Sequence, residues 1–296
     1  MTLSQSILAT LAYHDIFDYP LILKEIHKYL VNIEASPFSV RAGLNRLFLS
    51  GKIFSKSGYI FLESRSKIVE KRIQRKRISS RKFQRAVFFS NILKANPFIK
   101  TVGVTGALAM DNSDQKDDID LFLITTKDFI WTARFFSNLF MIPFKRSPVS
   151  KITKNKACLN IFIDESHLKI EPPNIYLAHE ICQMKPLWDR DGTYRRFISA
   201  NKWIKNFLPN WKPETVVNGQ WKMVNSRSKK SIYSLFTIYY SPIENFLRSF
   251  QLWYMRPKIT TEKIGDTQLF FHPADTQEWV MEKYKRRLRK LRIASS

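Results

Sequence analysis

Two aspartates, Asp118 and Asp120, stand on either side of an isoleucine at the start of the apolar run DIDLFLIT. Residues i and i+2 of a β-strand point to the same side, so a strand here turns Ile119 into the core and presents both carboxylates together. Two clustered carboxylates repel each other unless a cation lies between them. Their oxygen atoms suit Mg²⁺. The pair therefore predicts a site for a hard divalent cation.

A second chemical feature lies upstream, where another apolar run ends in Thr105-Gly106-Ala107. A short helix can begin at this turn, and backbone N–H groups at a helix N-terminus bind phosphate. A glycine lets the phosphate approach the backbone closely. The stretch from Thr105 to Asp120 therefore predicts a phosphate site next to a metal site.

The elements that must position these residues are strands and a helix around the two motifs. Apolar runs at 99–104, 119–125 and 157–163 predict three strands, and the second is nearly all apolar, as a buried strand should be. The segment 129–141 predicts a helix, too short for a membrane span. The fold class expected for this region is α/β (α+β), with a mixed sheet flanked by helices.

The turn, the polar loop and the Asp-x-Asp strand together resemble the signature of the polymerase-beta-like nucleotidyltransferase superfamily. The resemblance implies two Mg²⁺ ions held by Asp118 and Asp120, and a nucleoside triphosphate such as ATP bound at Thr105, Gly106 and Ala107. It also implies that a substrate hydroxyl attacks the α-phosphate in line and that pyrophosphate leaves. The sequence does not identify the molecule that accepts the nucleotide.

The sequence departs from the family pattern at two places. Ala107 stands where the family often has serine, so a hydroxyl contact to phosphate is lost. The family's third carboxylate aligns with Asn160, and Asp164 on the same strand face is its alternative; the expected catalytic set is Asp118, Asp120, Asn160 and Asp164. These departures leave open a weakened or inactive protein that acts as a nucleic-acid-binding or regulatory module. A third alternative is the nucleotidyltransferase half of a toxin–antitoxin pair.

The rest of the chain divides into three further units by pattern. Residues 1–63 have the order of three helices and a hairpin and resemble a winged-helix domain. Residues 64–96 form a basic linker helix, with ten Lys and Arg between 65 and 85. The catalytic domain is expected at 97–172, and a helical region at 173–296. The pair His179-Glu180 lies on a predicted helix and has no second histidine at helical spacing, so we expect a structural role for it.

Composition narrows the possible partners. The chain has 296 residues and a net charge of +24, which favours nucleic acid or nucleotides as binding partners. Nucleic acid would bind through the basic helix and the winged-helix-like unit. Neither G-x-G-x-x-G nor a P-loop motif is present. The two cysteines, Cys158 and Cys182, have no metal-ligand spacing and make no disulfide framework, so a cytoplasmic protein is expected. Because the longest apolar stretch is too short to cross a bilayer, no membrane span is expected.

Overall fold

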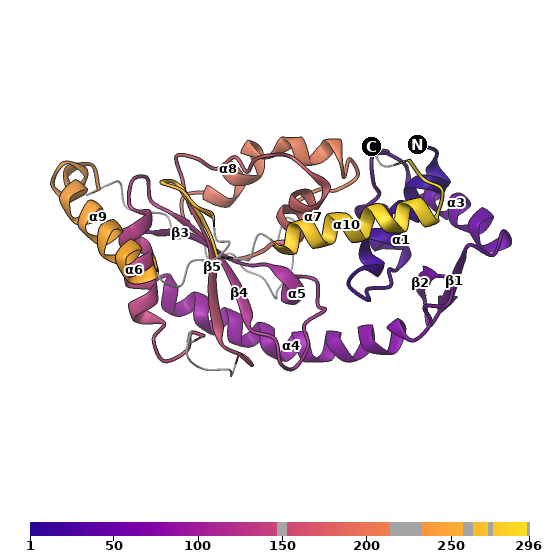
Figure 1. Cartoon of the computed structure of the whole chain (residues 1–296), viewed down its shortest axis with the longest axis horizontal. Coiled ribbons are helices and arrows are strands. Elements are labelled where there is room, and N and C mark those ends of the chain that lie inside the picture. Colours follow the sequence, from indigo (N-terminus) through magenta and orange to yellow (C-terminus); the bar gives the residue numbers. More distant parts are fainter. Residues whose placement is uncertain (147–152, 214–232, 257–262, 272–274, 295–296) are drawn as a thin grey trace.

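A six-stranded mixed sheet forms the centre of the computed structural model, which describes residues 1–146, 153–213, 233–256, 263–271 and 275–294. The strand order is β6-β3-β4-β5-β8-β7; β4 and β5 are parallel, and the other neighbours are antiparallel. Helices cover both faces (Figure 1). The expected fold class is confirmed. The strands are β3 (Ile99–Val104), β4 (Ile119–Thr125), β5 (Ala157–Asp164), β6 (Lys185–Asp189), β7 (Lys263–Ile264) and β8 (Gln268–Phe270).

The N-terminal unit has the expected order of three helices and a hairpin. Thr2 and Gln5 form a capping box at the start of the first helix, and Ser36 caps the third, where Pro37 occupies the first turn. Gly51 follows the third helix with φ +66°, a conformation that glycine adopts without strain. The elements are α1 (Leu3–Asp15), α2 (Leu23–Lys28), α3 (Pro37–Leu49), β1 (Ile53–Lys56) and β2 (Tyr59–Leu62).

One face of the sheet packs against α4 (Ile68–Leu93) and α6 (Ile130–Phe140), and α9 (Tyr233–Met255) lies on α6. The long helix α4 runs beneath the sheet and reaches the N-terminal unit (Figure 1). Its C-terminal half buries Phe83, Phe89 and Leu93 against the strands. Its N-terminal half carries many of the Lys and Arg residues. The predicted basic helix therefore has an apolar end that belongs to the core.

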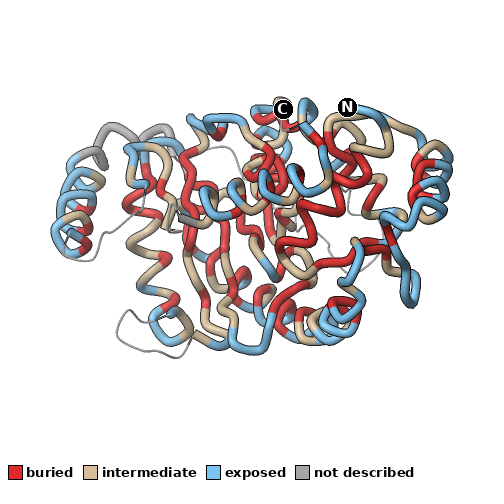
Figure 2. The backbone as a smooth tube through the Cα atoms, turned by 45° about the vertical axis from the view of Figure 1, so that its right-hand side comes forward, coloured by how far each residue is buried: buried red, intermediate tan, exposed pale blue. Residues whose placement is uncertain are grey.

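The other face of the sheet is covered by α7 (Ile175–Gln183), α8 (Thr193–Ala200) and α10 (Asp275–Lys290), and the short helix η1 (Lys202–Asn206) packs on α7. Phe122 and Ile161 point to this side and share one hydrophobic core with α1. The last helix, α10, runs from the sheet to α1, where the rings of Tyr284 and Tyr13 lie 5.4 Å apart. Figure 2 shows buried residues both in the centre of the molecule and in the helix next to the N-terminus.

A buried arginine fastens the N-terminal unit to the sheet. The Arg72 side chain on α4 donates to Glu25 of α2 at 2.9 Å and lies 3.7 Å over the ring of Tyr19. It also donates to the carbonyl oxygens of Met110 and Asp111, at 2.8 and 3.2 Å. Only 4% of Arg72 is exposed. One side chain thus connects the N-terminal unit, α4 and the loop that leads to β4.

Three strands come from the segment expected to be helical, 173–296. β6 contains Pro186 and lies at one edge of the sheet, where a strand tolerates proline. β7 and β8 have two and three residues, and they form only because β8 pairs with β5. Such short strands have no periodicity to recognise, and their existence depends on tertiary pairing.

Replacing Arg72 tests this connection. Arg72→Ala removes the buried positive charge that pairs with Glu25 and the donor to two carbonyl oxygens, and we expect the free energy of unfolding to fall by about 3–5 kcal/mol. Arg77→Ala on the exposed side of α4 is the matched control, with an expected change within about 0.5 kcal/mol. Urea unfolding measures both. Equal losses in the two variants would contradict the assigned role of Arg72.

Candidate metal centre

The two aspartates lie on one face at the start of β4, as their spacing predicts. Ile119 is fully buried on the side facing α4 and α6, so Asp118 and Asp120 point to the opposite side. The β4 strand is held on both sides, by β3 and by β5, which fixes the edge from which the carboxylates project. The sheet therefore holds the pair rigidly.

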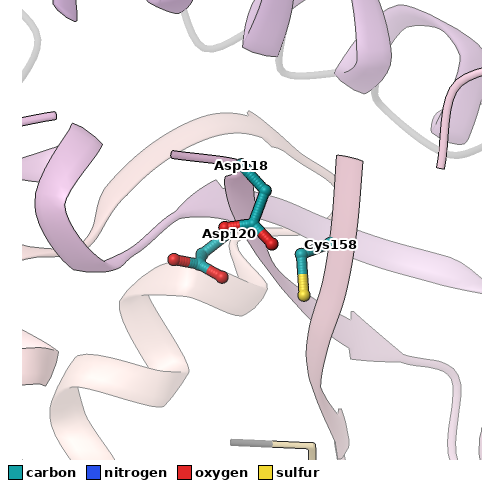
Figure 3. Close-up of side chains that lie close together, drawn as sticks. All are labelled: Asp118, Asp120 and Cys158. Carbon is teal, nitrogen blue, oxygen red and sulfur yellow. The ribbon is translucent and has the colours of Figure 1, made fainter. Parts of the chain in front are cut away.

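A thiol completes this cluster. The parallel pairing of β4 and β5 sets Cys158 beside Asp120, and Asp118, Asp120 and Cys158 each offer a ligand atom within 4.8 Å of the others (Figure 3). Cys158 could not be recognised as part of this cluster from the sequence, because it has no metal-ligand spacing to another residue along the chain. The only available signal was its position two residues before Asn160 on the strand expected to carry the third ligand.

The electrostatics of the cluster favour a cation. Burial, then the charges of Asp118 and Glu180, raises the pKa of Asp120 to about 7. Burial, with the neighbouring Asp120 and Asp118, also raises the pKa of the Cys158 thiol, which stays protonated. A divalent cation at this position would offset both the cost of burying the Asp120 charge and its repulsion with Asp118. The side chains present therefore fit a hard metal ion held by the two carboxylates.

Arg146, which the sequence did not indicate as a site residue, lies beside the pair. Arg146 Nη1 lies 3.3 Å from Asp118 Oδ2, and about half of its side chain is exposed. A partly exposed arginine can leave a carboxylate for a phosphate oxygen, because its fork of N–H donors fits either anion. Lys156, which precedes β5, has its Nζ 3.5 Å from the carbonyl oxygen of Pro143.

Gly106 lies directly against Asp120. Its φ is +62°, and a Cβ at this position would meet Asp120 Oδ2 at 2.8 Å. The backbone N–H of Thr105 donates to the Asp120 carbonyl oxygen at 3.1 Å, which ties the turn to β4. Ala107 follows in the four-residue helix α5 (Gly106–Ala109), and its carbonyl oxygen accepts from the N–H of Asn112. The three residues expected at the phosphate site thus lie beside the expected metal ligands.

The two candidates for the third carboxylate have different positions. Asn160 is buried, and its Nδ2 donates to Asp120 Oδ1 at 3.3 Å, so it orients that carboxylate. Asp164 is at the far end of β5, about 13 Å from Asn160 at normal strand rise. There it accepts hydrogen bonds from Ser166 and from the N–H of Asp128. These contacts hold Asp164 at the end of the strand that lies away from the pair, so the structure does not bring it together with Asp118 and Asp120.

A cavity of about 250 Å³ opens over Gly106, Ala107 and Asp120. Tyr13 and His14 of α1 and Tyr176 and Glu180 of α7 are among its other walls, so the N-terminal unit helps to enclose it.

Two histidines, His14 and His179, are buried beside this cavity. His179 stacks on the ring of Tyr13 at 3.8 Å, and burial lowers the pKa of both histidines, that of His14 to about 4. The histidines are neutral packing residues, whereas Glu180 faces the cavity.

No protein-family model matches this chain, and no curated protein and no solved structure matches it. No helix in the described part of the chain has the length and apolarity needed to cross a membrane.

The contact between Gly106 and Asp120 gives a direct test. Gly106→Ala adds a Cβ that must displace the Asp120 carboxylate, so we expect a loss of about 1–3 kcal/mol in stability and much weaker Mn²⁺ binding. Gly58→Ala is the matched control, since Gly58 has φ +79° but nothing within 4 Å of its Cβ position. Urea unfolding and Mn²⁺ titration followed by electron paramagnetic resonance measure both effects. Unchanged Mn²⁺ affinity in Gly106→Ala would argue against Asp120 as a ligand.

Proposed function

We propose that this protein is a divalent-metal-dependent nucleotidyltransferase that transfers a nucleoside monophosphate from a nucleoside triphosphate to a hydroxyl acceptor. The observation that carries the proposal is the pairing of Asp118 and Asp120 on one face of β4, with Gly106 packed directly against Asp120. The resemblance to polymerase-beta-like nucleotidyltransferases supports the same assignment. The free thiols of Cys158 and Cys182 are consistent with a reducing cytoplasm.

Each residue of the site has a defined part in this reaction. Asp118 and Asp120 would hold Mg²⁺, which supplies positive charge to the phosphate oxygens of the nucleotide. The Asn160 amide holds Asp120 in orientation, and Arg146 supplies a further positive charge beside Asp118. The backbone of Thr105 to Ala107 would contact the phosphates, and the absence of a side chain at Gly106 lets the Asp120 carboxylate lie directly against this turn.

The departures from the family pattern have a definite consequence. Asn160 is uncharged and cannot accept a proton near neutral pH, and the Cys158 thiol stays protonated because burial raises its pKa. The cluster on the sheet therefore provides charge and position for the nucleotide. The proton of the attacking hydroxyl must go to a group outside this cluster.

Isosteric changes at the pair test the proposed function. Asp118→Asn and Asp120→Asn remove one ligand charge each with little change in shape. We expect Mg²⁺ with ATP to stabilise the parent protein in a thermal-shift assay and to give no stabilisation in either variant. Asp114→Asn, exposed in the same loop, is the control and should behave as the parent. A parent that gains no stability from any nucleoside triphosphate with Mg²⁺ or Mn²⁺ would contradict the proposal.

A second candidate function is nucleic-acid binding along α4. A groove of about 620 Å³ lies between this helix and two loops, and Arg81, Lys82, Arg85 and Lys154 are among its walls. Lys82 is anchored by donating to the carbonyl oxygen of Asp117, while Arg81, Arg85 and Lys154 are exposed. Exposed cations along a groove neutralise the phosphates of a nucleic-acid chain.

The salt dependence of binding tests this second candidate. We expect a fluorescent single-stranded RNA to bind the parent with an affinity that falls steeply with salt, since each phosphate contact contributes about −0.7 to the slope. Arg81→Gln/Arg85→Gln should reduce that slope by about 1.4, whereas Arg286→Gln/Arg289→Gln, exposed on α10, should not change it. Fluorescence anisotropy measures both. Equal slopes in all three proteins would exclude the α4 groove.

A further inference from the structure

A second and larger cavity, of about 500 Å³, lies on the same face of the sheet as Asp120. The sheet forms its floor, and α7, α8 and α10 form its walls, in the region where α7 and α10 lie beside the strands in Figure 1. Tyr176, Glu180 and Thr276 line both this cavity and the smaller one over Gly106. A molecule in the larger cavity would therefore lie next to the nucleotide site, separated from it by these three side chains.

The lining of the larger cavity is mainly apolar. Phe122, Ile161 and Phe270 come from the sheet, and Phe197 and Met281 come from the helices above it. The charged side chains at its walls have both signs, with Glu171 and Glu278 against Lys263 and Lys285, so the cavity has no strong preference for an anion. Cavities of this size bind small organic molecules. The walls therefore fit a compound with a flat apolar body.

Glu180 is the polar group best placed to act on such a compound. It lines both cavities, and no group among the described residues donates a hydrogen bond to its carboxylate. Its charge contributes to the raised pKa of Asp120, so the two carboxyl groups interact. Burial raises the pKa of Glu180 itself to about 7, in the range suited to a general base. Glu180 is also outside the cluster of Asp118, Asp120 and Cys158.

We propose that the larger cavity binds the acceptor, a small compound with an apolar ring and a hydroxyl group, and that Glu180 is the catalytic residue that removes its proton. This inference depends on the proposed nucleotidyltransferase function. The acceptor oxygen forms a bond to the α-phosphorus as the bond from that phosphorus to the bridging oxygen breaks. Pyrophosphate leaves with the bonding electron pair, and the hydroxyl proton moves to the Glu180 carboxylate and then to solvent.

The experiment uses 2-naphthylmethanol, a flat apolar ring with one hydroxyl, and the full chain. Equilibrium dialysis measures its binding to the parent, to Met281→Trp, which fills the cavity, and to Glu282→Trp, which is exposed on the same helix outside it. Transfer of label from α-³²P ATP to the alcohol is then measured in the parent, Glu180→Gln and Glu180→Asp. A Mg²⁺–ATP thermal shift on every variant reports nucleotide binding and folding separately.

We expect the parent to bind and label the alcohol, and Met281→Trp alone to weaken binding roughly tenfold. Glu180→Gln should lower the transfer rate by about 100-fold or more while the Mg²⁺–ATP shift persists, and Glu180→Asp should restore part of the rate. The inference is overturned if the parent binds Mg²⁺–ATP but not the alcohol, binds the alcohol without labelling it, or labels only macromolecules. Full activity in Glu180→Gln also overturns it. A parent that does not bind Mg²⁺–ATP refutes the proposed function itself.

Discussion

The repulsion between two carboxylates at the edge of one buried strand is the constraint on which the candidate site depends. Asp118 and Asp120 cannot separate, because β4 is paired on both sides and Ile119 is buried between them. Burial and this repulsion hold the pKa of Asp120 near 7. A pair held in this way would stabilise a cation placed between the two carboxylates. The proposed reaction requires a nucleoside triphosphate whose phosphate oxygens bind that cation.

Segments from both ends of the chain enclose this pair. Asp15 at the end of α1 accepts hydrogen bonds from Arg65, which precedes α4, and from Arg287 on α10, at 2.6 and 2.8 Å. Arg72 joins the same unit to the loop before β4. The cavity over Gly106 is therefore assembled from α1, α5 and α7, and its shape depends on contacts far from the metal ligands. The larger cavity, between α7, α8 and α10, has its floor on the same sheet.

The sequence predicted the central elements closely and the ligand set only in part. Strands β3 and β4 have the expected bounds, because each is a mainly apolar run that polar or turn residues delimit. The carboxylate pair followed from strand geometry alone. The sequence did not indicate Cys158 or Glu180 as site residues. The parallel pairing of β4 and β5 that sets Cys158 beside Asp120, and the side of α7 that faces the cavity, are determined only by the folded structure. Asp164 shares the strand of Asn160 as predicted, but its hydrogen bonds with Ser166 at the far end of β5 could not be predicted from the strand pattern.

The most direct measurement is the anomalous scattering of Mn²⁺ in crystals grown with a non-hydrolysable ATP analogue. We predict an anomalous peak between the carboxylates of Asp118 and Asp120, with the analogue's phosphates extending from it toward the turn at Gly106. Arg146 should then contact a phosphate oxygen instead of Asp118. An analogue bound at another place, or bound here with no Mn²⁺ between the two carboxylates, would contradict the account.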